Sequence, residues 1–262
     1  MRFAFDLISD LHVETWGQFD WSGQATSPYC VVAGDVCRDV EILRETLEHL
    51  GQCYQGVFYI DGNDEHRYTL DDLGSSYRLV SAAARGIEKV VFMQDNVVII
   101  NGVAILATNG WWSYDLDPSL DYDQSIAWHC QRMQISETSA RSVTGVAMTD
   151  ANYLINSVRK LQTHADVRAI VIVSHTVPYA EILAHDLELM DNWRFNCMGS
   201  PYMMRALEED REHKVKTWCF GHYHKPVDRY FEGVRFVNNC RGRNGTDYCQ
   251  SVYYPKRIVV EF

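Results

Sequence analysis

The chain has 262 residues, 47% of them hydrophobic, and its formal net charge is −11. This length and composition allow one large domain or two small ones around a sizeable hydrophobic core. The acidic charge and the lack of any block of Lys and Arg argue against long polyanions, so no long duplex nucleic acid is expected as a partner.

Signals for secretion or membrane insertion are missing from the sequence. Residues 1–9 are short for a signal peptide and contain Asp6, and no apolar run approaches the roughly 20 residues of a membrane span. The eight cysteines include no pair with two-residue spacing, which argues against finger-type zinc sites. We therefore expect a cytoplasmic protein with reduced core thiols and no membrane partner.

The first third of the chain alternates short apolar runs with turns. β-Branched and aromatic runs bounded by turn residues are typical of buried strands, and apolar residues at helical spacing predict helices. The order strand, loop, strand, helix, strand predicts a parallel, buried sheet built from crossover units. The expected strands are residues 3–8, 29–33 and 57–60, and the expected helices are residues 39–50, with Asp39 as N-cap, and residues 70–86.

The rest of the chain adds further strands, helices and one unusual segment. Residues 109–141 are rich in Trp, Tyr and Asp, and we expect an inserted lid-like segment there, partly helical after residue 123. No repeat or linker divides the chain, so we predict a single domain over residues 1–262. The other expected elements are a hairpin of residues 97–100 and 103–106 around Asn101-Gly102, a helix at 150–164, a strand at 169–173, a loop at 179–200, a short helix from Pro201 to near His213, a strand at 215–220, a hairpin at 230–237 and a strand at 257–262.

Polar side chains with metal-binding chemistry directly follow several of these strands. Parallel strands bring their carboxyl ends to one edge of a sheet, where open α/β folds place their ligands, so these side chains are expected to converge. Burying them without partners would be costly, which also favours a shared role. They are Asp10, His12, Asp35, Asn63, His175, His222 and His224.

This set of seven residues offers two carboxylates, one amide oxygen and four imidazoles. It suits Mn, Fe or Zn better than Ca or Mg, which prefer sites made of oxygen alone. Seven ligands are too many for one tetrahedral site, but they suit two metals that share a bridging carboxylate, as in two-metal hydrolases. We therefore predict two divalent metal ions as cofactors, with manganese first and iron or zinc as alternatives.

The motifs that carry these residues resemble, in order and spacing, those of the calcineurin-like metallophosphoesterase superfamily. Asn238-Asn239-Cys240-Arg241-Gly242 also resembles the Asn-Pro-Arg-Gly segment that follows the last motif in many members, with Cys240 in place of proline. The resemblance covers nearly the whole chain and implies a four-layer α/β/β/α sandwich with mixed sheets. The five motifs are Asp10-Leu11-His12, Gly34-Asp35, Gly62-Asn63, His175 and Gly221-His222-Tyr223-His224.

The resemblance also implies an activity and a role for each ligand. Water-derived attack on phosphorus would proceed in line, with both cations neutralising charge on the phosphoryl oxygens. The implied reaction is the hydrolysis of phosphate esters. In the implied division of labour, Asp10, His12 and His224 would hold the first metal, Asn63, His175 and His222 would hold the second, and Asp35 would bridge.

The third motif departs from the family pattern. Most members have a histidine after the Gly-Asn pair, which contacts the phosphate and protonates the leaving group, and Asp64 occupies that place here. An ordinary aspartate is ionised at neutral pH and would repel a phosphate dianion. The candidate catalytic acids are therefore Asp64 with a raised pKa, or His66 two residues on, unless the substrate needs no acid.

This departure favours phosphodiesters, which carry less negative charge, with a nucleotide or small-molecule phosphatase as the alternative. A non-catalytic scaffold on the same fold is a further alternative, although family members that have become scaffolds have usually lost metal ligands. The acidic charge disfavours a nuclease subunit. The expected partner is a small phosphate ester or a nucleotide, whose base could stack on Trp111, Trp112 or Tyr114. Nothing in the sequence predicts the oligomeric state.

Overall fold

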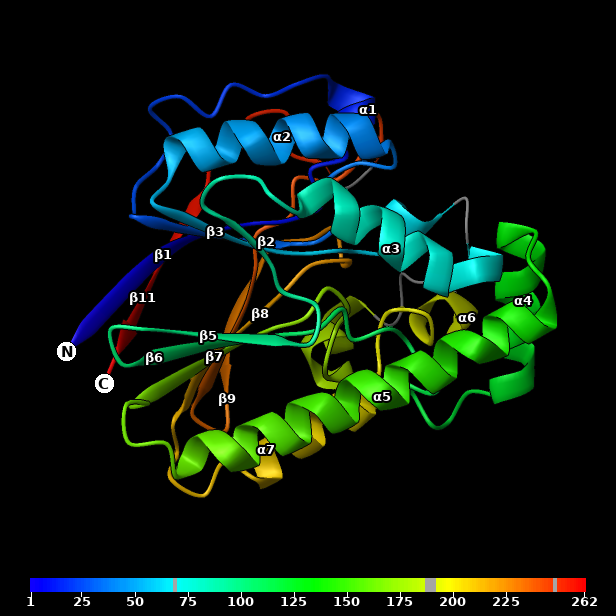
Figure 1. The fold of residues 1–262 in the computed structure, drawn as a ribbon. Coiled ribbons are helices and arrows are strands. Elements are labelled where there is room, and N and C mark those ends of the chain that lie inside the picture. The colour runs from blue at the N-terminus through cyan, green and yellow to red at the C-terminus, as the bar shows by residue number, and fades with distance from the viewer. Residues whose placement is uncertain (68–69, 187–191, 247–248) are drawn as a thin grey trace.

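The computed structural model describes residues 1–67, 70–186, 192–246 and 249–262 (Figure 1). Two mixed β-sheets stack face to face at its centre. The first sheet has the order β11-β1-β2-β3-β4, formed by Lys256–Glu261, Arg2–Ile8, Tyr29–Ala33, Gly56–Ile60 and Val90–Phe92. The second has the order β5-β6-β7-β8-β10-β9, formed by Asn96–Ile100, Val103–Ala107, Ala169–Val173, Val215–Phe220, Val234–Asn238 and Val227–Phe231.

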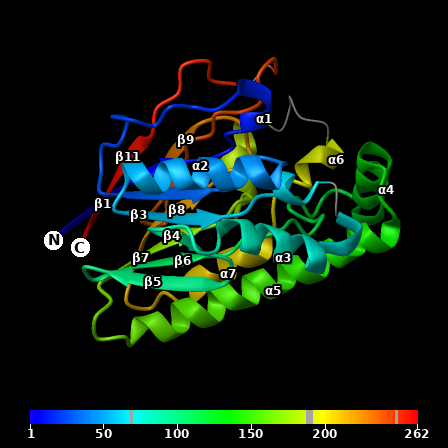
Figure 2. The same ribbon diagram turned by 45° about the horizontal axis from the view of Figure 1, so that its top comes forward.

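Helices cover the outer face of each sheet (Figures 1 and 2). Helices α2 (Val40–Cys53) and α3 (Leu73–Ala84) pack on the first sheet, and α5 (Glu137–Gln162) packs on the second with α7 (Arg205–Glu208). The expected four-layer α/β/β/α sandwich with mixed sheets is thereby confirmed. The other helical elements are α1 (Val13–Trp16), α4 (Tyr122–Met133), α6 (Asn192–Phe195), η1 (Asp64–His66), η2 (Leu70–Asp72), η3 (Ala180–Asp186) and η4 (Pro201–Met204).

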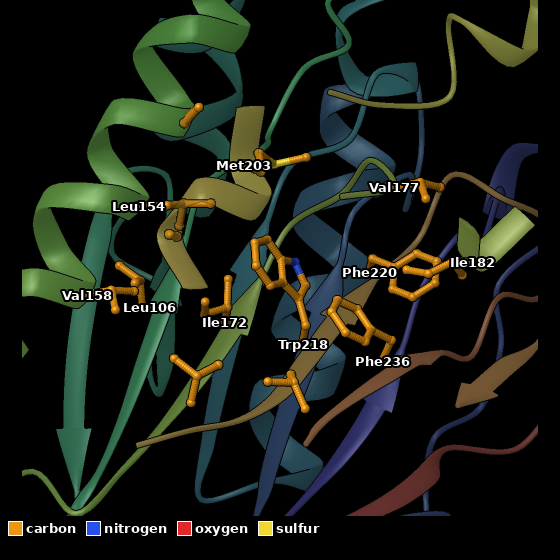
Figure 3. Packing of buried hydrophobic residues seen from close by; sticks show 14 of the residues in the cluster. Leu106, Leu154, Val158, Ile172, Val177, Ile182, Met203, Trp218, Phe220 and Phe236 are labelled. Carbon is orange, nitrogen blue, oxygen red and sulfur yellow. The ribbon is translucent and has the colours of Figure 1, made fainter. Parts of the chain in front are cut away.

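Apolar side chains fill the interfaces between the four layers. Phe5, Val31 and Ile105 lie between the two sheets and are fully buried. On the outer face of the second sheet, Trp218 belongs to a cluster that includes Leu154 of α5 (Figure 3). Because both faces of each sheet are covered, the central strands are nearly continuous apolar runs, which is why short apolar segments predicted them.

The parallel strands of each sheet end at a common edge. Strands β1, β2 and β3 run parallel to one another, and so do β6, β7, β8 and β10. Just beyond β1, Ser9 forms a parallel bridge with Cys240, which follows β10. This bridge joins the two sheets at the edge where the turns with the predicted ligands lie.

Several local predictions are confirmed in detail. The Asp39 side chain caps α2 by accepting the N–H groups of Glu41 and Ile42. Strands β5 and β6 form the expected antiparallel hairpin, and both turn residues, Asn101 and Gly102, have positive φ angles, of 51° and 85°. Such angles are what a tight two-residue hairpin requires.

Other elements differ from the expectation. Helix α5 begins at Glu137 rather than near residue 150, because Ser136 caps it and its first half packs with small residues such as Ala140 and Ala147. Small side chains such as alanine give only a weak hydrophobic periodicity, which is the pattern that predicts a helix from the sequence. The three-residue strand β4 was not expected, and the short helix ends at Glu208 rather than near His213. The loop expected at 179–200 contains η3 and α6, and its residues 187–191 lie outside the described part of the chain.

None of the helices within the described ranges is both long enough and apolar enough to cross a membrane. No disulfide joins the eight cysteines, all of which lie in the described ranges, and five of them are buried.

Candidate metal centre

The seven predicted ligands meet at the edge where the two sheets are joined. Six of them offer carboxylate or imidazole atoms in two groups, and within each group these atoms lie within 4.8 Å of one another. The amide oxygen of Asn63 lies 3.1 Å from Nε2 of His175, which adds Asn63 to the second group. The first group is Asp10, His12, Asp35 and His224, and the second is Asp35, His175 and His222, so that Asp35 belongs to both.

The donor atoms of the first group point at one another. Nε2 of His12 lies 3.1 Å from Nε2 of His224, and the latter nitrogen lies 3.3 Å from Oδ1 of Asp10. Two imidazole nitrogens and a carboxylate oxygen that face one another have the chemistry of a transition-metal site. The residues present therefore fit a divalent cation, and Asp35 is shared between the two groups.

Backbone hydrogen bonds fix the orientation of two ligand imidazoles. Nδ1 of His175 lies 2.9 Å from the carbonyl oxygen of Ala33, and Nε2 of His222 lies 3.0 Å from that of Cys197. A ring nitrogen that donates to a carbonyl leaves the other nitrogen unprotonated in the neutral ring and available to a metal. The fold thus selects the tautomer that each ligand needs.

The turns that carry the ligands approach so closely that three of their positions, Gly34, Gly62 and Gly221, admit only glycine. A Cβ atom at Gly34 would collide with the ring of His175, and one at Gly62 would collide with the carboxylate of Asp35. Gly34 also has a φ of 85°, which side chains rarely adopt. The glycine before each of these ligands in the sequence is therefore a condition for the turns to meet.

Four of the seven candidate ligands have strained backbone conformations. Asp10, His12, Asp35 and His222 have φ angles of 51°, 44°, 53° and 62°. Each such conformation costs on the order of 1–3 kcal/mol in a residue with a Cβ and is found mainly at functional sites. The surrounding fold therefore holds these side chains in place at a cost in stability.

Glu65 was not predicted as a site residue. It directly follows Asp64, the position at which the third motif departs from the family pattern. Its buried carboxylate accepts N–H groups from Asp35 at 3.2 Å, Val36 at 2.7 Å and Gly62 at 2.9 Å. Burial, together with the nearby charge of Asp35, raises the pKa of Glu65 to about 8. Glu65 ties the turn of the bridging aspartate to the turn that carries Asn63. Its place directly after Asp64 in the third motif was the sequence signal for it.

Burial sets the electrostatics of the ligands. It raises the pKa of Asp35 to about 6, although the positive charge of His175 acts in the opposite direction. Burial and repulsion from His175 lower the pKa of His222 to about 3, so the ring of His222 is neutral, as a metal ligand must be. A desolvated carboxylate such as that of Asp35 attracts a cation strongly.

Asp64 contacts two of the candidate ligands, Asp35 and His12. Its backbone N–H donates to Oδ1 of Asp35 at 2.8 Å, and its Oδ2 lies 3.3 Å from Nδ1 of His12, the ring nitrogen that faces away from His224. Arg38 and Arg243 also bind Oδ2. Burial alone would raise the pKa of Asp64, but His12 and Arg38 outweigh it and hold the pKa at about 2. The geometry thus gives Asp64 a positioning role toward His12 in place of the acid role considered above.

His66 does not reach the candidate centre. Its Nε2 lies 2.6 Å from Oδ2 of Asp61, and its Nδ1 lies 2.6 Å from Oγ of Ser76. The ring is fully buried and contacts the rings of Tyr77 and Trp111. Because both nitrogens are engaged outside the two ligand groups, this placement gives no support to His66 as the acid.

Residues 109–141 form a loop, helix α4 and the start of α5. Trp111, Trp112 and Tyr114 are 0%, 3% and 0% exposed, and the ring of Trp112 stacks on His222 with 5.6 Å between centroids. Side chains this deeply buried offer no open face to a nucleotide base. Trp111, Trp112 and Tyr114 therefore pack in the interior, and Trp112 supports one ligand ring.

Asp150 of α5 binds the backbone near the start of the 109–141 segment. Its Oδ2 accepts the N–H groups of Gly110 at 2.8 Å and Trp111 at 3.2 Å. Burial, reinforced by the negative charge of Asp95, raises the pKa of Asp150 to about 7. The folded protein therefore binds the Asp150 proton more tightly than the unfolded chain does.

The free energy of unfolding is accordingly expected to fall as the pH rises from about 4 to about 7, because Asp150 must ionise in the interior. Asp150→Asn should reduce this fall by on the order of 2 kcal/mol between pH 5 and pH 7. Urea denaturation of both proteins across this range measures the effect. Asp166→Asn, at an exposed position, is the control and should leave the slope unchanged. An unaltered slope in Asp150→Asn would contradict the assignment.

No protein-family model and no curated protein matches the chain. Among solved structures, the phosphopantetheinyl hydrolase PptH from Mycobacterium tuberculosis is 17% identical, with a TM-score of 0.69 over 94% of this chain and 93% of that one. GAP50, the anchor in the inner membrane complex of Plasmodium, is 13% identical, with a TM-score of 0.50 over 98% of this chain and 77% of that one. Together with the layered sheets and the converging turns, these likenesses identify the fold of the chain as that of the calcineurin-like metallophosphoesterases.

Proposed function

We propose that the chain hydrolyses phosphate esters at a centre of two divalent metal ions, with manganese as the first choice. The observation that carries this proposal is the pair of ligand groups that share Asp35. Hydrolase chemistry in PptH, which has the same fold, supports it. Bound cations would lower the pKa of the attacking water and neutralise charge on the phosphoryl oxygens.

The residues of the chain would prepare the site for this reaction. Asp64 fixes the ring of His12, and Glu65 fixes the turn of Asp35, so the donors need little rearrangement when cations bind. Donors held in place in this way stabilise developing charge without a cost of reorganisation. Asp10, His12 and His224 would hold one cation, Asn63, His175 and His222 would hold the other, and Asp35 would contact both.

The placement of Asp64 and His66 bears on the kind of ester. Asp64 is engaged as an anion by Arg38 and Arg243, and His66 is bonded to Asp61 and Ser76. Neither side chain offers a proton to a leaving group at the ligand cluster. We therefore favour phosphodiester substrates, or other esters whose leaving group departs without a proton, over simple alkyl monoesters.

The test is a hydrolysis assay with bis(4-nitrophenyl) phosphate and 4-nitrophenyl phosphate, each with added Mn²⁺, Fe²⁺ or Zn²⁺ and with EDTA as the control. Metal-dependent hydrolysis of the diester, at a higher kcat/KM than that of the monoester, is the expected result. A large preference for the monoester would overturn the diester assignment and favour a phosphatase. Failure of every metal to support either reaction would overturn the proposed function.

A non-catalytic scaffold is the second candidate, because the structural neighbour GAP50 is an anchor. A scaffold has no need for strained ligands or for carboxylates that orient imidazoles, and such features cost stability. Their presence in this chain favours an enzyme. A chain that binds none of the three metals in equilibrium dialysis would favour the scaffold.

A further inference from the structure

Asn109 follows β6 of the second sheet, and its side chain reaches across to the first sheet. Its Nδ2 donates to the backbone oxygen of Asp61 at 3.0 Å and to Oδ2 of Asp61 at 3.2 Å. Asp61 directly follows β3, which belongs to the first sheet. Both residues are fully buried. The contact therefore links the two sheets in the interior, at the edge where the candidate ligands lie.

This link lies between two residues of the second ligand group. Asp61 stands two positions before Asn63, and the backbone oxygen of Asn109 accepts the N–H group of His175 at 2.8 Å. The donor atoms of these two ligands, Oδ1 of Asn63 and Nε2 of His175, are 3.1 Å apart. A single asparagine is thus bonded to the turn of each ligand.

Asp61 is itself held from its other side. Its Oδ2, which accepts from Asn109, lies 2.6 Å from Nε2 of His66, and Nδ1 of His66 lies 2.6 Å from Oγ of Ser76 in α3. His66 and Ser76 are buried as well. This chain of hydrogen bonds ties Asp61 to α3, so Asn109 is bonded to a point that the first layer of the fold holds in place.

The contact with Asp61 depends on the side chain of Asn109, whereas the contact with His175 does not. The N–H group of His175 bonds to a backbone oxygen beyond the parallel pairing of β6 with β7, and any residue at position 109 could accept it. The bonds to two oxygens of Asp61 require a side-chain donor of this length. Within the described ranges, Asn109 has no hydrogen bond to a member of the first ligand group.

We propose that Asn109 is a positioning residue for the second ligand group, which it serves by setting how closely the turns of Asn63 and His175 approach each other. This inference rests on the proposed function and adds to it a residue that touches no ligand side chain. Contacts that orient metal ligands raise the affinity for the cation, and their loss weakens it. The cation held by the first ligand group should not depend on Asn109.

The test is calorimetric titration of Mn²⁺ into the metal-free protein and into two variants. Asn109→Ala removes the donor, and Asn109→Asp keeps the shape of the side chain but offers no donor to Asp61 when ionised. Either variant that folds, as judged by circular dichroism, should bind one of the two Mn²⁺ ions about ten-fold or more weakly and the other with unchanged affinity. A general loss of stability would not weaken one ion selectively.

Electron paramagnetic resonance gives a second readout that does not depend on turnover. Two Mn²⁺ ions that share a carboxylate bridge are magnetically coupled, and their spectrum differs from that of an isolated ion. At equal concentrations of Mn²⁺, the Asn109 variants should show more of the isolated-ion spectrum than the unaltered protein does.

Gln162→Ala is the matched control. Gln162 is another buried amide that joins two segments: its Nε2 donates to the backbone oxygen of Val158 at 3.2 Å, and its Oε1 accepts the N–H group of Glu212 at 3.0 Å. It lies outside both ligand groups. Its replacement should lower the free energy of unfolding and leave both Mn²⁺ affinities and the spectrum unchanged.

A double variant tests the route of the effect. His175→Ala breaks the second ligand group, so that one Mn²⁺ ion should remain. Adding Asn109→Ala to this variant should leave the affinity for the remaining ion unchanged, because Asn109 then has no ligand pair to position.

The outcomes separate this inference from the proposed function. If the unaltered protein binds two Mn²⁺ ions but hydrolyses neither nitrophenyl ester, the proposed function fails and the titrations still decide the role of Asn109. Unchanged affinities in both Asn109 variants, or a further loss when Asn109→Ala is added to His175→Ala, would overturn the inference and leave Asn109 as a link between the sheets alone. A protein that binds no Mn²⁺ would overturn both.

Discussion

Asp35→Asn is expected to lower kcat/KM for phosphate-ester hydrolysis by about 10³-fold or more, because Asp35 alone belongs to both ligand groups. The amide keeps the size of the side chain but removes the negative charge that a bridging ligand supplies. The second cation should then bind weakly, and calorimetric titration with Mn²⁺ should find fewer tight sites than in the unaltered protein.

Asp228→Asn is a suitable control for this experiment. Asp228 of β9 is a partly exposed aspartate that pairs with Arg235 of β10 and with Lys256 of β11, outside both ligand groups. Its replacement should leave hydrolysis and metal stoichiometry intact. An Asp35→Asn protein that keeps kcat/KM within a few-fold of the original would refute the bridging role, even if another ligand proved essential.

Trp218→Ala is expected to reduce the free energy of unfolding by about 3–5 kcal/mol. Trp218 of β8 is fully buried, and its ring stacks on Phe236 with 5.9 Å between centroids (Figure 3). Its Nε1 donates to Oγ of Ser174 at 2.9 Å. Alanine would leave a large cavity between the second sheet and α5 and would remove the hydrogen bond that the buried hydroxyl of Ser174 accepts. Urea denaturation with a fluorescence or circular-dichroism readout measures the loss.

Two further variants test the cause of this loss. Trp218→Phe fills most of the volume and should cost less than alanine. Tyr230→Ala removes an aromatic ring that is 74% exposed on β9, and its effect should stay within about 0.5 kcal/mol. Equal losses in Trp218→Ala and Tyr230→Ala would show that burial between sheet and helix is not what stabilises this layer.

The sequence predicted the sheets and the ligand cluster because both depend on local patterns. Buried parallel strands are continuous apolar runs, and a strand end followed by Asp, Asn or His marks the edge where ligands gather. That is why His12 and His224, 212 positions apart, were expected together and lie 3.1 Å apart. The start of α5 escaped prediction because Ala140 and Ala147 give little hydrophobic contrast.

The electrostatic setting of Asp64 could not be read from the sequence. Its partners Arg38 and Arg243 lie 26 and 179 positions away, in turns whose own patterns carry no sign of the contact. Considered alone, Asp64 is a negative charge that would repel phosphate. In the folded protein its carboxylate is paired with Arg38, Arg243 and His12. These pairings depend on tertiary contacts alone.

The parallel bridge between Ser9 and Cys240 joins the start of the chain to a segment near its end, and this has a consequence for synthesis on the ribosome. Each ligand group combines a residue from the start of the chain with a histidine near its end, at 222 or 224. A nascent chain therefore exposes Asp10 and Asp35 long before the imidazoles that complete their groups have been translated. On the proposed function, metal loading would follow translation of nearly the entire polypeptide, and products of premature termination upstream of His222 would lack a histidine from each group.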